Sequence, residues 1–198
     1  FIFIAVLLMI NGVGIFLPAN PEKTNAQITS NQLINGLNFP YVAPEITDIT
    51  AWINSPPLQL AQLTGKVILI DFWAYSCINC VRTLPYLTNW YNKYKGQGLV
   101  IIGIHSPEFD FEKELANVQK SVQQHKINYP VGLDNNFTTW RNFSNHYWPA
   151  HYLLDKNGKV VYTHFGEGDY AITENNIRFL LGLNQPVDNI QQPVARFV

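Results

Sequence analysis

Cysteine and charge are both scarce in this chain of 198 residues. Two cysteines cannot build a framework of structural disulfides, which needs several cysteines spread along the chain. The formal net charge is -1, and the 13 Lys and Arg are scattered rather than gathered into a patch. We therefore expect no nucleic-acid partner. No internal repeat is visible.

Apolar residues, by contrast, are plentiful. Hydrophobic residues make up 47% of the chain and aromatic residues 14%. This composition and length suit one domain of ordinary size with a packed core, together with appendages at its ends.

The first 17 residues, FIFIAVLLMINGVGIFL, carry no charge. As a helix they would span about 25 Å, slightly less than the roughly 30 Å of a bilayer core. Two interpretations remain open, the core of a signal peptide or the end of a transmembrane helix. Both deliver the following residues to the outside of the membrane, in the periplasm or on the outer face of the cytoplasmic membrane. We favour a membrane anchor.

Composition divides the rest of the chain into three parts. Residues 18–43 are rich in Asn, Pro, Thr and Gln and have little periodicity, which is typical of a linker. Residues 44–182 are expected to form the compact domain. Residues 183–198 carry two prolines and no period, and we expect a tail there.

Hydrophobic periodicity predicts strands that alternate with helices in the domain. Buried strands are expected at 67–72 and 99–104, and a hairpin at 151–155 and 160–165 around Asn157-Gly158. Helices are expected at 78–95, 111–126, 137–145 and 173–181. Pro85 should kink the first of these helices. The second has Leu115, Val118 and Val122 on one face, as in an amphipathic helix. This order favours an α/β fold in which helices flank a central mixed β-sheet.

The two cysteines are three positions apart, in Cys77-Ile78-Asn79-Cys80. Zinc would need two further ligands, and the chain has no second Cys-x-x-Cys and no His-x-x-x-His. A strand that leads directly into a helix places Cys77 at the helix N-terminus, where backbone N–H groups and the helix dipole stabilise a thiolate. Cys80, one turn deeper, can then close a disulfide. A redox pair is a better account than two idle buried thiols.

The segment DFWAYSCINC, from Asp71 to Cys80, resembles the active-site segment of thioredoxins. Pro85 matches the proline that kinks the following helix in that family. Trp148-Pro149 resembles the family's cis-proline, which faces the cysteines and holds extended substrate backbone. A cis X-Pro bond is uncommon, so this expectation is specific. The resemblance implies a thioredoxin-like fold and a redox-active disulfide Cys77-Cys80, without another cofactor or a metal.

A narrower resemblance covers residues 44–182. The opening of this region, its predicted helix at 111–126 and the hydrophobic lead-in are similar to the extracytoplasmic TlpA/ResA branch of the thioredoxin-like family. The motifs WINSPPL, YSCINC, SPEF, LDNN, YWPA and FGEGDY are most similar to the thioredoxin-like domain of DipZ-type proteins. In the resulting fold, an inserted helix lies between the second core strand and the cis-proline region.

This resemblance implies a thiol–disulfide oxidoreductase of the protein-disulfide reductase type. Its substrates would be protein thiols and disulfides outside the membrane, including haem-attachment cysteines in cytochrome c maturation. A CcdA-like membrane protein would supply electrons.

Four further residues are candidates for supporting roles. Asp71 lies in the apolar strand before Cys77 and matches the buried Asp of thioredoxins, which suits it to take the proton of Cys80. The ResA-like resemblance implies that Glu108 lies beside the cysteines as a second acid–base group, although it could be an ordinary surface glutamate. Trp73 and Trp148 are expected to form apolar walls of the substrate site, next to Pro149.

The five histidines have no spacing typical of metal ligands, and each is expected to be an ordinary core or surface residue. His105, near a strand end, could approach the site.

Two alternative functions stay open. A thiol peroxidase would be expected to show Pro-x-x-x-Thr/Ser-x-x-Cys where this chain has DFWAYSC. A copper chaperone on the same fold usually spaces its cysteines as Cys-x-x-x-Cys.

Overall fold

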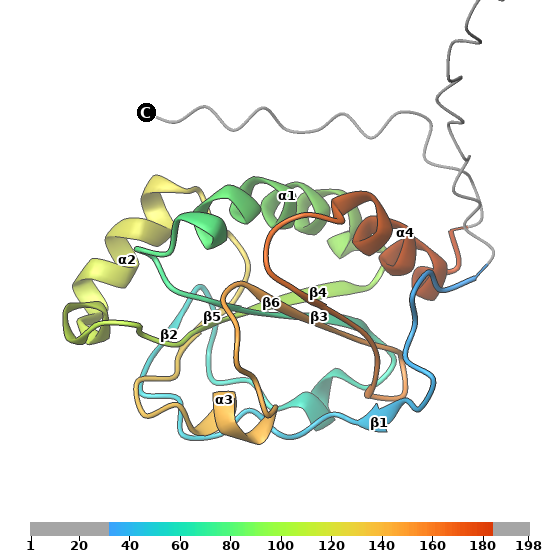
Figure 1. Ribbon diagram of the computed structural model, residues 1–198, viewed down its shortest axis with the longest axis horizontal. Helices are drawn as coiled ribbons and strands as arrows, with labels where there is room; N and C mark the ends of the chain where they lie inside the picture. Colours follow the sequence, from blue (N-terminus) through green and yellow to red (C-terminus); the bar gives the residue numbers. More distant parts are fainter. Residues whose placement is uncertain (1–31, 184–198) are drawn as a thin grey trace, which may run out of the picture.

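The computed structural model describes residues 32–183 and centres on one seven-stranded sheet. Its strand order is β1-β7-β6-β3-β4-β5-β2 (Figure 1). Strands β3, β4 and β5 run parallel, and every other neighbouring pair is antiparallel. The strands are β1 (Tyr41–Val42), β2 (Trp52–Ile53), β3 (Val67–Trp73), β4 (Leu99–His105), β5 (Val131–Leu133), β6 (Ala150–Leu154) and β7 (Lys159–Phe165).

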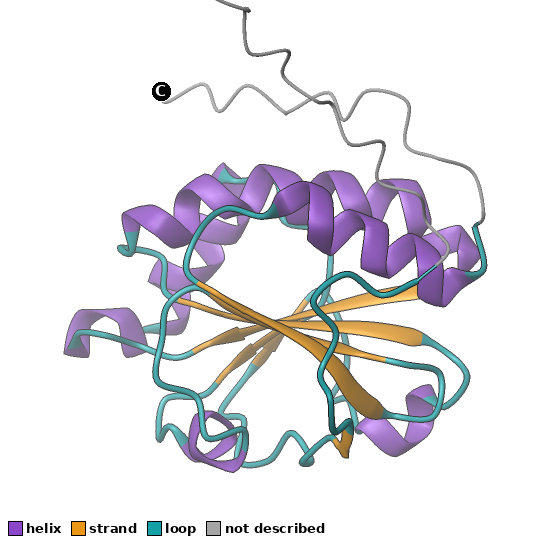
Figure 2. Cartoon of the chain, turned by 45° about the vertical axis from the view of Figure 1, so that its right-hand side comes forward, coloured by secondary structure: helices purple, strands orange, loops and turns teal. Residues whose placement is uncertain are grey.

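Helices cover both faces of this sheet (Figures 1 and 2). One face carries α1 (Ile78–Tyr94), α2 (Leu115–Gln124) and α4 (Tyr170–Leu181). The opposite face carries the short helix α3 (Thr138–Asn142) and the 3-10 helix η1 (Leu60–Leu63). Two further 3-10 turns, η2 (Lys95–Gln97) and η3 (Asp110–Lys113), flank β4. The α/β fold with a mixed central sheet is confirmed, and α2 is the inserted helix between β4 and the cis-proline region.

Strand β3 divides the interior into two cores. All seven of its residues are buried. Because successive side chains point to opposite faces, Val67, Leu69 and Trp73 join the core under α1 and α4, whereas Ile68, Ile70 and Phe72 join the core under α3. Burial on both faces explains why the strand reads as an apolar run that only Asp71 interrupts. Asp71 shares the face of Leu69 and Trp73.

Several predicted elements are confirmed. Helix α1 ends within one residue of its expected bound and contains Pro85. The hairpin of β6 and β7 forms around Asn157-Gly158, and Gly158 has the positive φ of 75° that such turns favour.

The single helix expected at 111–126 is wrong. It divides into η3 and α2, because Glu114 between them has extended backbone with φ -73° and ψ 117°. Within η3, Glu112 turns inward and accepts backbone N–H groups, which fixes this turn separately from the helix. Leu115, expected on the buried face, is 38% exposed as the first residue of α2, while Val118 and Val122 are buried as expected.

Contacts with the domain begin before the boundary expected at residue 44. The N–H of Leu37 donates to the carbonyl of Val161 at 2.8 Å, and β1 pairs with β7. The hydrophobic segment 1–17 and most of the tail lie outside the residues that the structure describes. Between residues 32 and 183, no helix is both long and apolar enough to cross a membrane.

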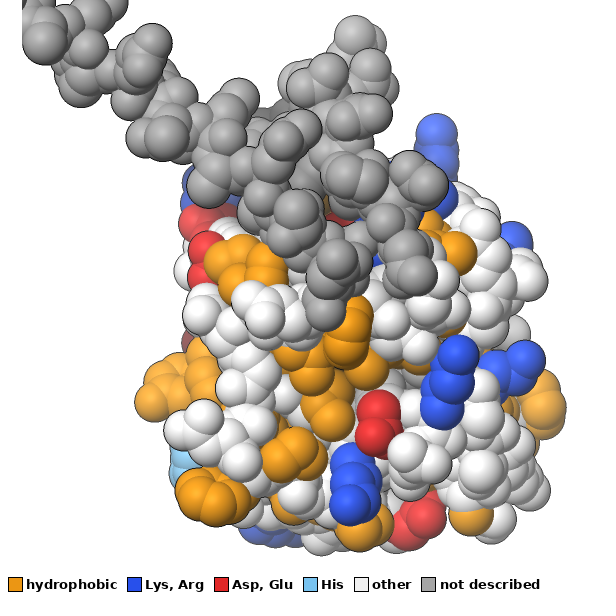
Figure 3. Space-filling view, turned by 90° about the vertical axis from the view of Figure 1, so that its right-hand side faces the viewer, with side chains coloured by type: hydrophobic (Ala, Val, Ile, Leu, Met, Phe, Trp, Pro, Cys, Tyr) orange, Lys and Arg blue, Asp and Glu red, His pale blue; other side chains and the backbone are white. Residues whose placement is uncertain are grey.

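The surface mixes apolar and charged side chains. On the face in Figure 3, hydrophobic side chains lie between separate acidic and basic ones, and neither charge dominates the visible part of this face. This distribution agrees with the net charge of -1.

Candidate active site

Cys77 is the N-cap of α1, just beyond the end of β3. Its N–H donates to the carbonyl of Ala74 at 3.2 Å, which closes the tight turn between strand and helix. Its Sγ accepts the backbone N–H of Cys80 at 3.3 Å, so the sulfur occupies the place of a capping oxygen. Both cysteines are free thiols; Cys77 is half-buried and Cys80 is 1% exposed.

The surroundings separate the acidities of the two thiols. A hydrogen bond from the Cys80 side chain lowers the pKa of Cys77 to about 7 from its ordinary 9.0. The backbone N–H groups of Cys80 and Asn79 lower this pKa further, whereas partial burial and the Glu108 carboxylate raise it. Burial raises the pKa of Cys80 far above its usual range, and the charges of Cys77 and Asp71 raise it further. At neutral pH, Cys77 is therefore the sulfur that ionises.

The Trp148-Pro149 peptide bond is cis, as predicted. Phe72 pairs with Ala150 across β3 and β6, which places Pro149 level with the last residue of β3. The carbonyl of Pro149 accepts the N–H of Gly166 at 2.8 Å. This proline therefore lies at the same end of the sheet as Cys77, on the neighbouring strand.

Only one of the two tryptophans expected as walls of the site reaches the surface. Trp148 is partly exposed, donates from Nε1 to the carbonyl of Ser106 at 3.1 Å, and packs on Trp140 with ring centroids 4.2 Å apart. Trp73 is 0% exposed and packs edge-on against His105 in the core. Trp73 thus lies beneath the site, because it ends a central strand whose two faces are both covered.

Asp71 is buried behind Cys80, where its charge acts on the pKa of that thiol. A basic side chain, which no sequence motif indicates, lies beside it. Asp71 and His151 are cross-strand partners on β3 and β6, and His151 Nε2 lies 3.3 Å from Asp71 Oδ1. The alternation of side chains along the predicted strand at 151–155 is a signal that could place His151 on the inner face. The pairing of this strand with β3, which brings His151 to Asp71, cannot be read from the spacing of residues alone.

The structure gives different places to two neighbouring glutamates. Glu108 is exposed, and its carboxylate acts on Cys77 through charge. Glu112, which no sequence motif indicates, is fully buried. Its Oε1 accepts the N–H of Ser76 at 3.0 Å, and its Oε2 accepts those of Glu108 and Phe109 at 2.6 and 3.0 Å. Glu112 therefore ties η3 to the residue that precedes Cys77.

His105 approaches the site from the end of β4. Its buried Nε2 accepts the N–H of Tyr75 at 3.3 Å, and the two rings stack with centroids 5.6 Å apart. Burial lowers the pKa of His105 to about 4, although the charge of Glu112 opposes this. The ring is therefore neutral at physiological pH, as its acceptor role requires.

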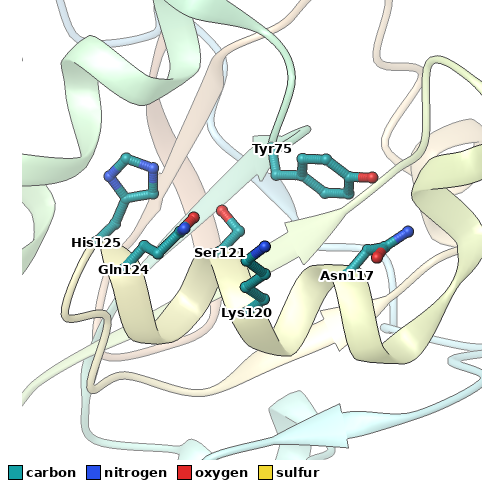
Figure 4. Close-up of a pocket in the computed structure, with 6 residues that line it drawn as sticks. All are labelled: Tyr75, Asn117, Lys120, Ser121, Gln124 and His125. Atoms are coloured by element: carbon teal, nitrogen blue, oxygen red, sulfur yellow. The ribbon is translucent and has the colours of Figure 1, made fainter. Parts of the chain in front are cut away.

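A small pocket of about 270 Å³ adjoins the loop that carries the cysteines. Figure 4 shows the ring of Tyr75 facing the side chains of α2 across this pocket. The lining is polar and consists of Tyr75, Asn117, Lys120, Ser121, Gln124 and His125.

Comparison with known proteins agrees with this geometry. The family model described as thioredoxin-like matches residues 65–160. The chain is 51% identical over 154 residues to the protein DipZ of Mycobacterium tuberculosis, which covers 76% of this chain and 22% of DipZ. It is 34% identical over 110 residues to the thiol-disulfide oxidoreductase ResA of Bacillus cereus, covering 56% of this chain and 61% of ResA.

Among solved structures, a thioredoxin-like protein in its oxidised form matches with a TM-score of 0.67 and 26% identity, over 75% of this chain and 100% of that protein. The resemblances drawn from the motifs are thereby confirmed. The chain thus contains a thioredoxin-like domain, and its sequence is similar to DipZ and to the thiol–disulfide oxidoreductase ResA.

Proposed function

We propose that this protein reduces disulfide bonds of exported proteins, with Cys77 as the attacking sulfur and Cys80 as the resolving sulfur. The observation that carries this proposal is the contrast between the two thiols. Cys77 is accessible and has a pKa of about 7, whereas Cys80 is buried and its pKa is raised. Since the thiolate is the nucleophile, Cys77 attacks first.

The exchange takes two displacements. The Cys77 thiolate attacks one sulfur of the substrate disulfide, which forms a mixed disulfide and releases the first substrate thiolate. Cys80 then gives its proton to Asp71 and attacks Cys77, and the second substrate thiolate leaves. The substrate gains two electrons, and the protein is left with a Cys77-Cys80 disulfide that a dithiol donor reduces again.

Other residues act on the substrate or on the cysteines. Pro149 and Trp148, at the same end of the sheet as Cys77, would hold the extended backbone of the substrate. Glu108 adjusts the acidity of Cys77 through its charge. In this proposal Trp73 supports the site from below rather than contacting the substrate.

The domain would work outside the cytoplasmic membrane, tethered to it by residues 1–17. The charge-free N-terminal segment and the similarity to DipZ and ResA support this location. Haem-attachment cysteines in cytochrome c maturation are candidate substrates, and a CcdA-like membrane protein is the candidate electron donor. This chain spans 22% of the length of DipZ, so these assignments are proposals for the domain alone.

Reduction of insulin disulfides, with dithiothreitol as the electron source, tests the proposed activity. We expect Cys77→Ser to abolish reduction, because no nucleophile remains. We expect Cys80→Ser to accumulate mixed disulfides between Cys77 and insulin, visible on a non-reducing gel. Reduction by Cys77→Ser at the unmodified rate would contradict the assignment. The direction of transfer is tested by equilibration with glutathione, where a strongly oxidising potential would argue against a reductase.

A further inference from the structure

Behind Cys80, a row of titratable side chains crosses three neighbouring strands. Asp71 on β3 pairs with His151 on β6, and His151 pairs with His164 on β7. Direct cross-strand partners project from the same face of a sheet, here the face covered by α1 and α4. The three side chains therefore lie side by side, and the row begins where the proposed mechanism deposits the Cys80 proton.

The row leads from the interior to solvent. His151 Nε2 lies 3.3 Å from Asp71 Oδ1, and the His151 and His164 ring centroids are 6.1 Å apart. His164 Nδ1 lies 3.7 Å from Asp169 Oδ2. Side-chain exposure rises along the row, from 1% at Asp71 and His151 to 14% at His164 and 56% at Asp169.

A purely structural role explains this row poorly. Both carboxylate oxygens of Asp71, both ring nitrogens of His151 and Nε2 of His164 are buried, and none makes a hydrogen bond of good geometry within residues 32–183. Burying polar groups without such bonds costs free energy, and apolar side chains at these positions would avoid that cost. The row therefore calls for a functional explanation.

We propose that His151 and His164 conduct the proton of Cys80 from Asp71 to solvent at Asp169. This inference rests on the proposed function, in which Asp71 accepts that proton. Because Asp71 is buried, it must lose the proton by some route before the next turnover. The row supplies this route, and His151 and His164 act as proton-transfer residues that do not touch the substrate.

The Sγ–H bond of Cys80 breaks, its proton goes to Asp71, and its electron pair forms the bond to Cys77. The bond between Cys77 and the substrate sulfur breaks, and that electron pair leaves on the substrate thiolate. Asp71 then protonates Nε2 of His151, which loses its Nδ1 proton toward His164 and the solvent. Transfer from Asp71 to His151, and then between the two rings, requires a side chain to rotate or a water molecule to bridge the gap. The leaving thiolate takes a proton from solvent.

The groups around the row are compatible with this direction. Burial raises the pKa of Tyr129 well above the usual range, and the charge of Asp71 raises it further, so Tyr129 keeps its proton. Trp90 of α1 packs near His151 and donates its indole N–H to Glu174 of α4. Burial and His151 lower the pKa of His164, while Asp169 raises it, so the neutral ring can accept a proton.

A single-turnover reaction of the reduced full chain with one equivalent of dithiobis(nitrobenzoate) tests this route. The first nitrothiobenzoate is released when Cys77 attacks, and the second when Cys80 resolves the mixed disulfide. We expect His151→Gln and His164→Gln to slow the second release by about tenfold and to leave the first unchanged. We expect added imidazole to restore the second release in His164→Ala, because this position reaches solvent. His125→Gln, directly after α2 and outside the row, is the matched control.

Three outcomes are decisive. An unchanged second release in both His151→Gln and His164→Gln, across the pH range, overturns the route. If His151→Gln loses the first release as well, its fold is disturbed, and the partly exposed His164 variants decide instead. Slow second release in His164→Ala without rescue by imidazole also contradicts proton transfer.

Two further variants separate this inference from the proposed function. If Asp71→Asn slows the second release and the histidine variants do not, only the route fails. If Asp71→Asn has no effect, the proposed role of Asp71 fails. If the Cys77→Ser protein still gives the first release of nitrothiobenzoate at the unmodified rate, the proposed function itself fails.

Discussion

At the scale of single residues, identical thiols acquire different chemistry from their surroundings. Cys77 is accessible and receives hydrogen bonds at the start of a helix, which favour its thiolate. Cys80 is enclosed in the core and stays protonated until it must react. The backbone around Cys77 is held in turn by Glu112, whose buried carboxylate accepts three N–H groups, one of them from Ser76.

Replacing Glu112 by Gln tests this support. One oxygen becomes an NH₂ group that faces N–H donors, so a buried donor is left without an acceptor. We expect a loss of about 1–3 kcal/mol in the free energy of unfolding and slower reaction of Cys77. Urea denaturation measures the first effect and alkylation kinetics the second. Glu108→Gln is the matched control, because its exposed side chain should change stability little and lower the Cys77 pKa slightly. Equal stability of the Glu112→Gln and unmodified proteins would contradict the supporting role.

At the scale of elements, periodic segments were predictable and short ones were not. The apolar runs that became β3 and β4 are long enough to indicate buried strands, and the 17 residues of α1 are enough to show a helical period. Strands β1 and β2 have two residues each and β5 has three, so their sequences are too short to show a period. They are defined only by pairing in the folded sheet, β1 with β7, β2 with β5, and β5 with β4. The break between η3 and α2 depends on the tertiary bonds of Glu112, which no local pattern shows.

The same distinction applies to the site. The cysteine pair and the cis bond before Pro149 follow from a local motif, so they were predictable. The partners of Asp71 and the loop contacts of Glu112 depend on strand register and on a turn distant in sequence. These contacts required the folded chain.

Gly103 on β4 shows how tightly the elements beneath the site pack. A Cβ atom there would lie 3.0 Å from Trp73 Nε1 and 3.3 Å from Tyr129. We expect Gly103→Ala to lower the free energy of unfolding by about 1–3 kcal/mol, because both rings are buried and cannot move freely. Chemical denaturation measures this, and Gly96→Ala, where a Cβ meets nothing within 4 Å, is the control. A Gly103→Ala protein as stable as the Gly96→Ala protein would show that this packing is loose.

At the scale of the whole molecule, buried neutral groups couple stability to pH. Burial lowers the pKa of His105 to about 4 in the folded protein, from an ordinary 6.5. As the pH falls from 6.5 toward 4, the unfolded chain therefore binds a proton that the folded chain does not. The stability that the neutral ring provides is complete above pH 6.5 and is lost through this interval.

We expect the contribution of His105 to this acid loss to be roughly 3 kcal/mol. Urea titrations across the interval should show a shallower pH dependence for His105→Gln than for the unmodified protein. His146→Gln, with an exposed ring, should retain the full slope. Parallel slopes for the His105→Gln and unmodified proteins would contradict the buried neutral state of His105.

The pH dependence of alkylation shows whether Cys77 ionises near neutrality while Cys80 stays protonated. The reduced protein is treated with iodoacetamide at a series of pH values, and mass spectrometry of peptides identifies the modified sulfur. The structure predicts modification of Cys77 with a midpoint near pH 7 and an unmodified Cys80. Equal modification of both cysteines, or a midpoint near the ordinary thiol pKa of 9.0, would show that the fold does not separate the acidities of the two thiols.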